Sequence, residues 1–330
     1  MIFVTGGTGL IGRHILQQFS ATGVACMALA RSERAADVLR SLGAKPIRGR
    51  VEDPGVWAEI SHCSAIVHAA AIIADHAPWE AFEAVNVRGT ALAARRAAEL
   101  AIPIVHISSV AVYGRSGNND DGSVDEDFRF GPLSNREYYA RSKRLAEGVL
   151  WREMSEGAAC VLRPCLVYGP GDRQFLPRVV AAARRGWLPR VGPGQKPLAL
   201  VHAASVAEAV RCALASEAAW GRAFNVTNDA EIGPGQFIDA VATGLGRPIR
   251  TVGVPEWAAL MAARAGDALR RGVGHDRAPS TLTGAVRFWR GGNPYRSAAA
   301  RDRLGWQPDI DHRILVAEAV RRLAGTSTRI

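Results

Sequence analysis

The sequence lacks the residue patterns of several large protein classes. Its five cysteines form no Cys-x-x-Cys pair and no even-numbered framework, so we expect neither a metal site nor a disulfide scaffold. The 41 lysines and arginines exceed the 31 acidic residues and give a net charge of +10, yet no run of about five like charges occurs. Because no nucleic-acid motif accompanies this charge, we expect no nucleic-acid partner and only an attraction for an anionic cofactor.

Long apolar segments are also absent. The longest nearly uncharged stretch, residues 60–74, is interrupted by His62, Ser64 and His68 and is shorter than the roughly 20 apolar residues of a membrane span. From Met1 the chain passes directly into a glycine loop without the pattern of an export signal. We therefore expect a cytoplasmic protein with no membrane partner.

Short apolar runs alternate with longer helical patterns through the first half of the chain. The runs are residues 2–4, 24–29, 46–47, 65–68, 102–107 and 160–162. This alternation predicts an α/β fold with a Rossmann doubly wound parallel sheet. We expect a dinucleotide-binding core over residues 1–164, with returning segments near 201–227. A smaller, discontinuous and mainly substrate-binding region follows over residues 165–330, where glycine and proline become frequent.

Three glycines, Gly6, Gly9 and Gly12, stand between the first predicted strand and the first predicted helix. Glycine permits a tight turn and lets the backbone approach a pyrophosphate, while the first amides of the helix supply free donors. The spacing in this context predicts dinucleotide binding. The residues expected to contact the cofactor here are Gly6, Thr8, Gly9, Leu10, Ile11 and Gly12.

The end of the second predicted strand indicates which nicotinamide dinucleotide binds. A free ribose 2′-hydroxyl usually meets a carboxylate there, whereas a 2′-phosphate needs a cation. The chain has Arg31 and Ser32 at this point, and no carboxylate precedes Glu33. Arg31 can make a bidentate phosphate contact, which favours NADP(H) over NAD(H). In the alternative reading, Arg31 is a solvated loop residue and Glu33 binds the ribose of NAD(H).

A phenol and an ammonium, Tyr139 and Lys143, are four residues apart and project from one face of a predicted helix. The ammonium favours the phenolate, so we expect the pKa of Tyr139 to fall below its usual value of about 10. Ser109 follows the predicted strand 102–107, at the sheet edge where open α/β sheets bind ligands. Ser109 and Tyr139 are therefore expected to hold one reacting oxygen.

With these motifs, the chain resembles the extended short-chain dehydrogenase/reductase superfamily over nearly its whole length. Within it, the chain is similar to the NAD-dependent epimerase/dehydratase family and closest to the 3β-hydroxysteroid dehydrogenase-like and dihydroflavonol reductase-like branches. The matching segments are residues 5–12, 68–70, 86–90, 108–114, Tyr139 with Lys143, 163–164, 167–170 and 304–306.

The resemblance implies that Ser109 orients the reacting oxygen, Tyr139 is the general acid/base, and Lys143 tunes Tyr139 and holds the nicotinamide ribose. It implies further cofactor contacts at Val51, Ala69, Ala70, Pro164 and Val167. It also implies a homodimer formed through helices around residues 80–100 and 138–154.

Two positions depart from the family pattern, since Arg50 and Ser205 stand where an aspartate is common. Two further residues have open roles. Asn86 is either a polar support or a helix-packing residue, and His68 is interpreted as a satisfied strand-end residue.

The predicted function is the transfer of a hydride between NADP(H) and a ketone or secondary alcohol of a fairly apolar small molecule. A nucleotide-sugar epimerase or dehydratase is the alternative, but Val110 and Ala111 replace the acidic pair of such dehydratases, and residues 194–198 lack their usual arginine. A nonenzymatic NADP(H)-sensing protein is a second alternative. Trp257 and Met261, four residues apart, are interpreted as core residues of the second region.

Overall fold

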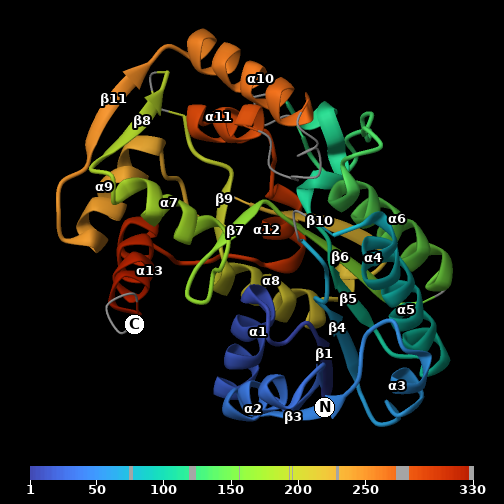
Figure 1. Cartoon of the computed structure of the whole chain (residues 1–330). Helices are drawn as coiled ribbons and strands as arrows, with labels where there is room; N and C mark the ends of the chain where they lie inside the picture. Colours follow the sequence, from blue (N-terminus) through green and yellow to red (C-terminus); the bar gives the residue numbers. More distant parts are fainter. Residues whose placement is uncertain are drawn as a thin grey trace.

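The computed structural model describes residues 1–73, 77–118, 124–155, 157–192, 194, 196–227, 230–272 and 282–326. Its centre is a seven-stranded, wholly parallel sheet in the order β10-β6-β5-β4-β1-β2-β3 (Figure 1). The strands are β1 (Ile2–Thr5), β2 (Cys26–Ala30), β3 (Ala44–Arg48), β4 (Ala65–His68), β5 (Ile104–Ile107), β6 (Ala159–Pro164) and β10 (Arg222–Val226). The Rossmann-type fold predicted from the alternating runs is therefore confirmed.

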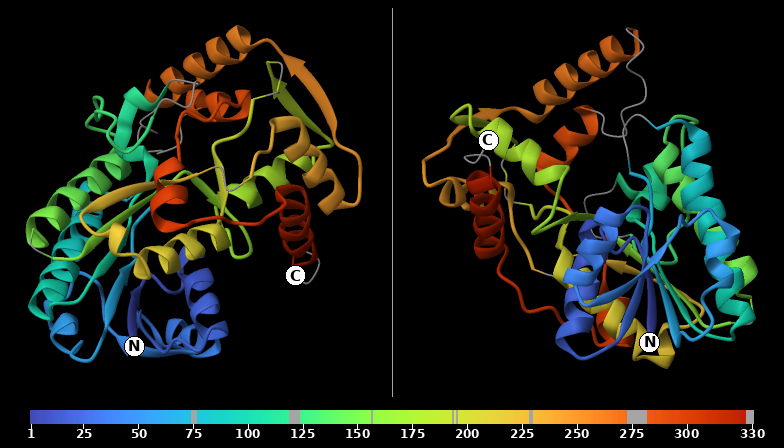
Figure 2. Two further views of the ribbon diagram at one scale, coloured as in Figure 1. Left: turned by 180° about the vertical axis from the view of Figure 1, so that it is seen from behind. Right: turned by 60° about the horizontal axis from the view of Figure 1, so that its bottom comes forward.

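Helices cover both faces of this sheet (Figure 2). One face carries α1 (Leu10–Ala21), α2 (Glu33–Ser41) and α8 (Ala203–Leu214); the other carries α3 (Pro54–Ala58), α5 (Gly89–Glu99) and α6 (Tyr138–Glu153). The short α4 (Trp79–Phe82) and a π-helical turn (Glu83–Arg88) lead into α5. Side chains alternate along each strand and fill one core on each face of the sheet. In β1, Val4 packs in the core under α1, α2 and α8, and Phe3 packs in the core under α3, α5 and α6.

Local sequence explains where the first helices begin and end. In α1, Ile15, Leu16 and Phe19 are buried at helical spacing, as predicted, and Gly23 follows with a φ of +71°. In α2, the Ser32 hydroxyl accepts a hydrogen bond from the backbone N–H of Ala35 at 3.2 Å. Gly23 thus follows the end of α1, and Ser32 fixes the start of α2 beside the carboxyl end of β2.

The carboxyl-terminal half adds two small parallel sheets and a third core. One sheet pairs β7 (Leu166–Tyr168) with β9 (Leu200–His202), and the other pairs β8 (Trp187–Val191) with β11 (Arg250–Val254). The helices here are α7 (Phe175–Ala183), α9 (Pro234–Leu245), α10 (Glu256–Gly272), α11 (Leu282–Arg290), α12 (Ala298–Leu304) and α13 (His312–Thr326). Because α8 and β10 join the main sheet, the segment near 201–227 returns to the first region; a division at residue 164 stays a prediction.

One sequence interpretation is wrong in this half. Trp257 and Met261 do not lie in a core, because both side chains point to solvent from α10. Two acidic residues of α10, Glu256 and Asp267, have partners in α11 on the inner side of the helix instead. Among the described residues, no helix has the length and apolarity needed to cross a bilayer.

Candidate active site

A cavity of about 880 Å³ opens along the carboxyl ends of β1, β2, β4, β5 and β6. Nearly all the residues predicted from sequence line it. These are Gly6, Thr8, Gly9, Leu10, Ile11, Gly12, Arg31, Val51, Ala69, Ala70, Ser109, Tyr139, Lys143, Pro164 and Val167. Ser32 is not part of the lining, because its hydroxyl caps α2. The sheet edge thus brings together residues from seven separate segments of the chain.

The glycine loop is shaped so that side chains are excluded from it. Gly6 has a φ of +70°, and a Cβ on it would lie 2.6 Å from the carbonyl oxygen of Ala69. A Cβ on Gly12 would overlap the carbonyl oxygen of Gly6. The first turn of α1 holds no acidic residue and its N-cap makes no side-chain hydrogen bond, so its amides face the cavity unshielded. This cradle fits the pyrophosphate of a dinucleotide.

Charges at the adenosine end are distributed unequally. Arg31 lines the cavity, whereas Glu33 is held by Arg40 at 2.9 Å and by Arg48 at 3.5 Å and is not part of the lining. Arg50, which replaces a common aspartate, pairs with Glu52 at 2.6 Å. Glu52 lines the cavity, so an acidic group is present close to the position where the family motif has its aspartate.

The three predicted catalytic side chains meet where β5 ends. Tyr139 lies in the first turn of α6 and hydrogen-bonds Ser109, which follows β5 by two residues. The Ser109 hydroxyl also accepts a hydrogen bond from the Ala111 N–H at 3.2 Å, which fixes its position at the start of a 3₁₀ helix (Val110–Asn118). One turn further along α6, the Lys143 Nζ donates to the Ile107 carbonyl at 2.6 Å.

Burial dominates the protonation of both groups. Burial raises the pKa of Tyr139, and the hydrogen bond from Ser109 lowers it only in part. The net direction is opposite to the fall expected from Lys143. Burial also lowers the pKa of Lys143 to about 8, against an opposing effect of the Glu147 carboxylate. A neutral phenol beside an amine that titrates near neutral pH is suited to donating a proton.

Asn86 ties the cofactor side of the cavity to the catalytic helix. Its side-chain amide accepts from the Ile72 N–H at 2.7 Å and donates to the Ile72 carbonyl at 3.1 Å and to the Ser142 hydroxyl at 2.9 Å. Ser142 in turn donates to the Tyr139 carbonyl at 2.8 Å. Asn86 is therefore a polar support for α6. His68, as interpreted from sequence, is buried and satisfied, between Thr5 at 3.0 Å and Thr90 at 3.1 Å.

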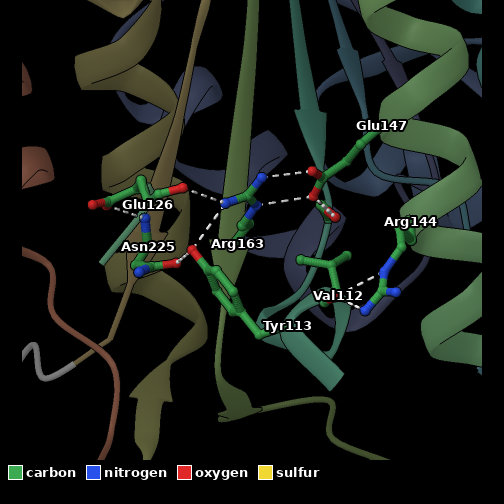
Figure 3. A network of polar contacts seen from close by, with 8 residues as sticks. Val112, Tyr113, Glu126, Arg144, Glu147, Arg163 and Asn225 are labelled. Atoms are coloured by element: carbon green, nitrogen blue, oxygen red, sulfur yellow. Dashed lines mark hydrogen bonds and ion pairs between the residues drawn. The ribbon is translucent and has the colours of Figure 1, made fainter. Parts of the chain in front are cut away.

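A buried ion pair joins β6 to α6, the helix that carries Tyr139 and Lys143 (Figure 3). The Arg163 side chain on β6 is 6% exposed and pairs at 2.7 Å with Glu147 on α6, which is 3% exposed. Ser108, next to Ser109, donates its hydroxyl proton to the same carboxylate. Glu147 thus joins the helix that carries Tyr139 and Lys143 to the two strands whose ends form the cavity floor.

The network continues away from the cavity through Tyr113 (Figure 3). Arg163 donates to the Tyr113 hydroxyl at 2.8 Å, and Tyr113 donates to Asn225 on β10 at 2.8 Å. Burial raises the pKa of the Tyr113 phenol to about 12, so it remains a neutral donor. Sequence reasoning missed this network, because the spacing of Glu147 four residues after Lys143 places it on the same face of α6 but does not point to Arg163 or Ser108 as its partners.

The substrate end of the cavity is largely apolar. Its lining includes Val110, Ala111, Cys165, Phe175 and Tyr295. Asp172, Arg173 and Gln174 add charged and polar groups to the lining just before α7 begins. Ser205, the second departure from the family pattern, is buried in α8 and is not in this lining; its carbonyl accepts from the Trp306 indole at 2.8 Å. Its replacement of an aspartate therefore does not change the cavity surface.

The sequence is similar to a known protein family and to named reductases. A family model described as the NAD dependent epimerase/dehydratase family matches residues 2–227. The chain is 33% identical to 4-hydroxy-2-methyl-3-oxo-4-farnesyl-3,4-dihydroquinoline-1-oxide ketoreductase of Stigmatella aurantiaca, over 84% of this chain and 83% of the relative. It is 28% identical to 2-alkyl-3-oxoalkanoate reductase of Shewanella oneidensis, over 77% of this chain and 68% of the relative.

Solved structures share the fold. The crystal structure of gox2253 superimposes with a TM-score of 0.78 and 24% identity, covering 99% of this chain and 98% of that one. This likeness concerns architecture alone.

Proposed function

Because the chain belongs to the NAD dependent epimerase/dehydratase family and is an NAD(P)-dependent oxidoreductase of the extended short-chain type, we propose that it reduces a ketone of an apolar small molecule with NADPH. One observation carries the proposal: Ser109, Tyr139 and Lys143 converge at the end of β5, in the same cavity as the glycine loop. The reverse oxidation of a secondary alcohol uses the same groups.

The side chains divide the work of the reduction. Ser109 and Tyr139 donate hydrogen bonds to the substrate carbonyl oxygen and so polarise the carbonyl carbon. When bound, the reduced nicotinamide supplies the hydride. Tyr139 then transfers its phenolic proton to the oxygen, and its raised pKa keeps that proton in place until the oxygen becomes basic. Lys143 stabilises the phenolate that remains, because its ammonium lies one helical turn away on the same face.

Arg31 supports a preference for NADP(H). Its side chain is the cation that the cavity lining presents after β2, where a 2′-phosphate would need a partner. The competing carboxylate, Glu33, is engaged by Arg40 and Arg48 outside the lining. The alternative in which Glu33 binds a ribose would require these two ion pairs to break.

The substrate class follows from the apolar end of the cavity and from the relatives. Two relatives are named as reductases of a farnesylated quinoline oxide and of 2-alkyl-3-oxoalkanoates, both of which carry a ketone and an alkyl or prenyl chain. We infer a ketone flanked by a hydrocarbon chain for this protein too. Val110 and Ala111 line the cavity beside Ser109 and do not supply the extra acidic pair of a dehydratase.

A direct spectrophotometric assay of cofactor oxidation tests the proposal. Purified protein is incubated with NADPH or NADH and a panel of 2-alkyl-3-oxo acids and long-chain ketones, and loss of reduced-nicotinamide absorbance is followed. We expect turnover with NADPH above that with NADH. Nucleotide sugars are the control substrates: a changed sugar product without net cofactor consumption would replace the reductase by an epimerase.

We also propose a cytoplasmic homodimer. The five cysteines are free and buried, which fits a reducing compartment. α5 and α6 lie side by side, joined by an ion pair between Arg95 and Glu153 at 2.9 Å, and Leu145 is exposed on α6. This face suits a four-helix interface. Light scattering measures the molar mass of the wild type and of Leu145→Glu in solution. We expect a dimer for the wild type and a monomer for the variant; a dimer that the substitution leaves intact contradicts the proposed interface.

A further inference from the structure

The helix α10 has its apolar side turned to solvent. Its large hydrophobic side chains Trp257, Met261 and Leu269 are 71%, 63% and 72% exposed. Ala262, Ala265 and Ala268 are exposed with them, so the outward face is apolar along most of the helix. In Figures 1 and 2 this helix lies at the edge of the molecule, with α11 between it and the rest of the chain.

The charged side chains on the inner side of α10 have partners in the neighbouring helix. Glu256 pairs with Arg290 of α11 at 2.8 Å. Asp267 is buried and accepts hydrogen bonds from the Leu282 N–H at 2.8 Å and from the Thr283 N–H and hydroxyl at 3.0 and 2.7 Å, which caps α11. Ala263 is buried on the same inner side, so α10 has apolar side chains on both its inner and its outward face, which is unusual for a surface helix.

Charge on this face selects among possible partners. Among the described side chains of α10, the charged residue on the exposed face is Arg264. No described carboxylate lies on the outward face of α10. The whole chain carries a net charge of +10, so an anionic lipid surface attracts it, and the outward face of α10 adds no described carboxylate that would oppose this contact.

We propose that α10 is a docking surface for an anionic phospholipid bilayer, in which it lies flat at the headgroup level with Trp257, Met261 and Leu269 inserted. The helix lies on the bilayer and does not cross it, because Glu256, Arg264 and Asp267 occur within its 17 residues. The expectation of no membrane partner rested on the lack of a spanning segment, which does not exclude surface binding.

α11, which packs against α10, reaches the catalytic cavity through an aromatic contact. Phe288 of α11 contacts Phe175 edge-to-face with ring centroids 5.4 Å apart, and Phe175 lines the cavity. Docking through α10 therefore brings the substrate end of the cavity towards the lipid. Delivery of a membrane-dissolved substrate rests on the proposed function, whereas lipid binding itself does not.

Vesicle flotation of the full-length protein tests the docking. Vesicles of phosphatidylcholine with phosphatidylglycerol are compared with phosphatidylcholine alone, and the double variant Trp257→Glu/Met261→Glu with the wild type. We expect wild-type protein to float with the anionic vesicles and less with the neutral ones, and the double variant to partition at least tenfold less. The matched control is Ile314→Glu, an exposed apolar side chain on α13, which should bind as the wild type does.

The outcomes separate the docking from folding and from catalysis. Unfolding midpoints of both variants report whether the chain still folds, and neither readout needs a substrate. Absence of wild-type binding to the anionic vesicles overturns the proposal, as does unchanged binding of a folded double variant. A wild-type dimer that the double variant abolishes would assign the face to a second copy instead, and this also overturns it.

Discussion

Replacing Glu147 by glutamine removes the carboxylate that holds the buried network together. Arg163 then keeps its charge at 6% exposure without its ion-pair partner. Breaking a buried ion pair by removing one member typically costs about 3–5 kcal/mol. Since whole domains are stable by only about 5–15 kcal/mol, we expect a large fall in the free energy of unfolding of Glu147→Gln.

The same substitution changes catalysis in a specific direction. The Glu147 carboxylate raises the pKa of Lys143 against the effect of burial, so its loss lowers that pKa further below about 8. If the ammonium supports Tyr139, the alkaline limb of the pH–rate profile moves to lower pH. Ser108, the residue before Ser109, also loses the carboxylate to which its hydroxyl donates.

Urea unfolding and pH–rate profiles measure both effects. Glu153→Gln is the matched control, because Glu153 lies on the same helix and pairs with Arg95 near the surface. The double variant Glu147→Gln/Arg163→Met removes both charges and should recover part of the lost stability. The reasoning is refuted if Glu147→Gln is no more damaging than Glu153→Gln, or if the double variant is less stable than the single one.

Three further predictions concern the cavity. Arg31→Ala should weaken NADPH binding at least tenfold and NADH binding little, as measured by fluorescence titration. The control is Arg34→Ala, because the Arg34 side chain is exposed; equal losses of affinity for both cofactors in Arg31→Ala would contradict the prediction. Gly6→Ala should abolish cofactor binding and cost more than the roughly 1–2 kcal/mol of its left-handed backbone, because the added Cβ would also lie 2.6 Å from the Ala69 carbonyl oxygen. Gly148→Ala, where the space is open, should be tolerated; calorimetry of both variants measures the difference, and equal stabilities would contradict it. The pKa of Lys143 is depressed from 10.5 to about 8 in the folded protein, so the unfolded chain binds more protons between these two pH values and Lys143 makes the free energy of unfolding rise with pH there. Urea unfolding of Lys143→Met should lack this rise, and an unchanged dependence of the unfolding free energy on pH would contradict the prediction.

The sequence contained enough information for the sheet and the cofactor loop. The apolar run 65–68 coincides with β4, and the glycines at 6, 9 and 12 lie between β1 and α1 as expected. These features depend on neighbours in the chain, and their periodicity and spacing can be read directly. The convergence of Ser109 with Tyr139 was predictable because both follow rules for sheet edges and helix faces.

Features that depend on long-range packing were not predictable. The partners of Glu147 lie 16 and 39 residues away along the chain, and no local pattern pairs them. The direction of the Tyr139 pKa was misjudged because the extent of burial is not visible in a four-residue spacing. Trp257 and Met261 share a helix face, but which face turns inward was decided by the partners of Glu256 and Asp267.

Tyr139 is proposed to deliver the proton, while Ser109 holds the reacting oxygen of the substrate and Lys143 stabilises the Tyr139 phenolate that remains. The most direct test is Tyr139→Phe, which removes only the hydroxyl, with NADPH affinity and ketone turnover measured on the same preparation. We predict that turnover falls by at least a hundredfold, in the range of general acid catalysis, while NADPH affinity stays within about threefold of wild type. Turnover that survives the substitution would contradict the assignment of the proton donor.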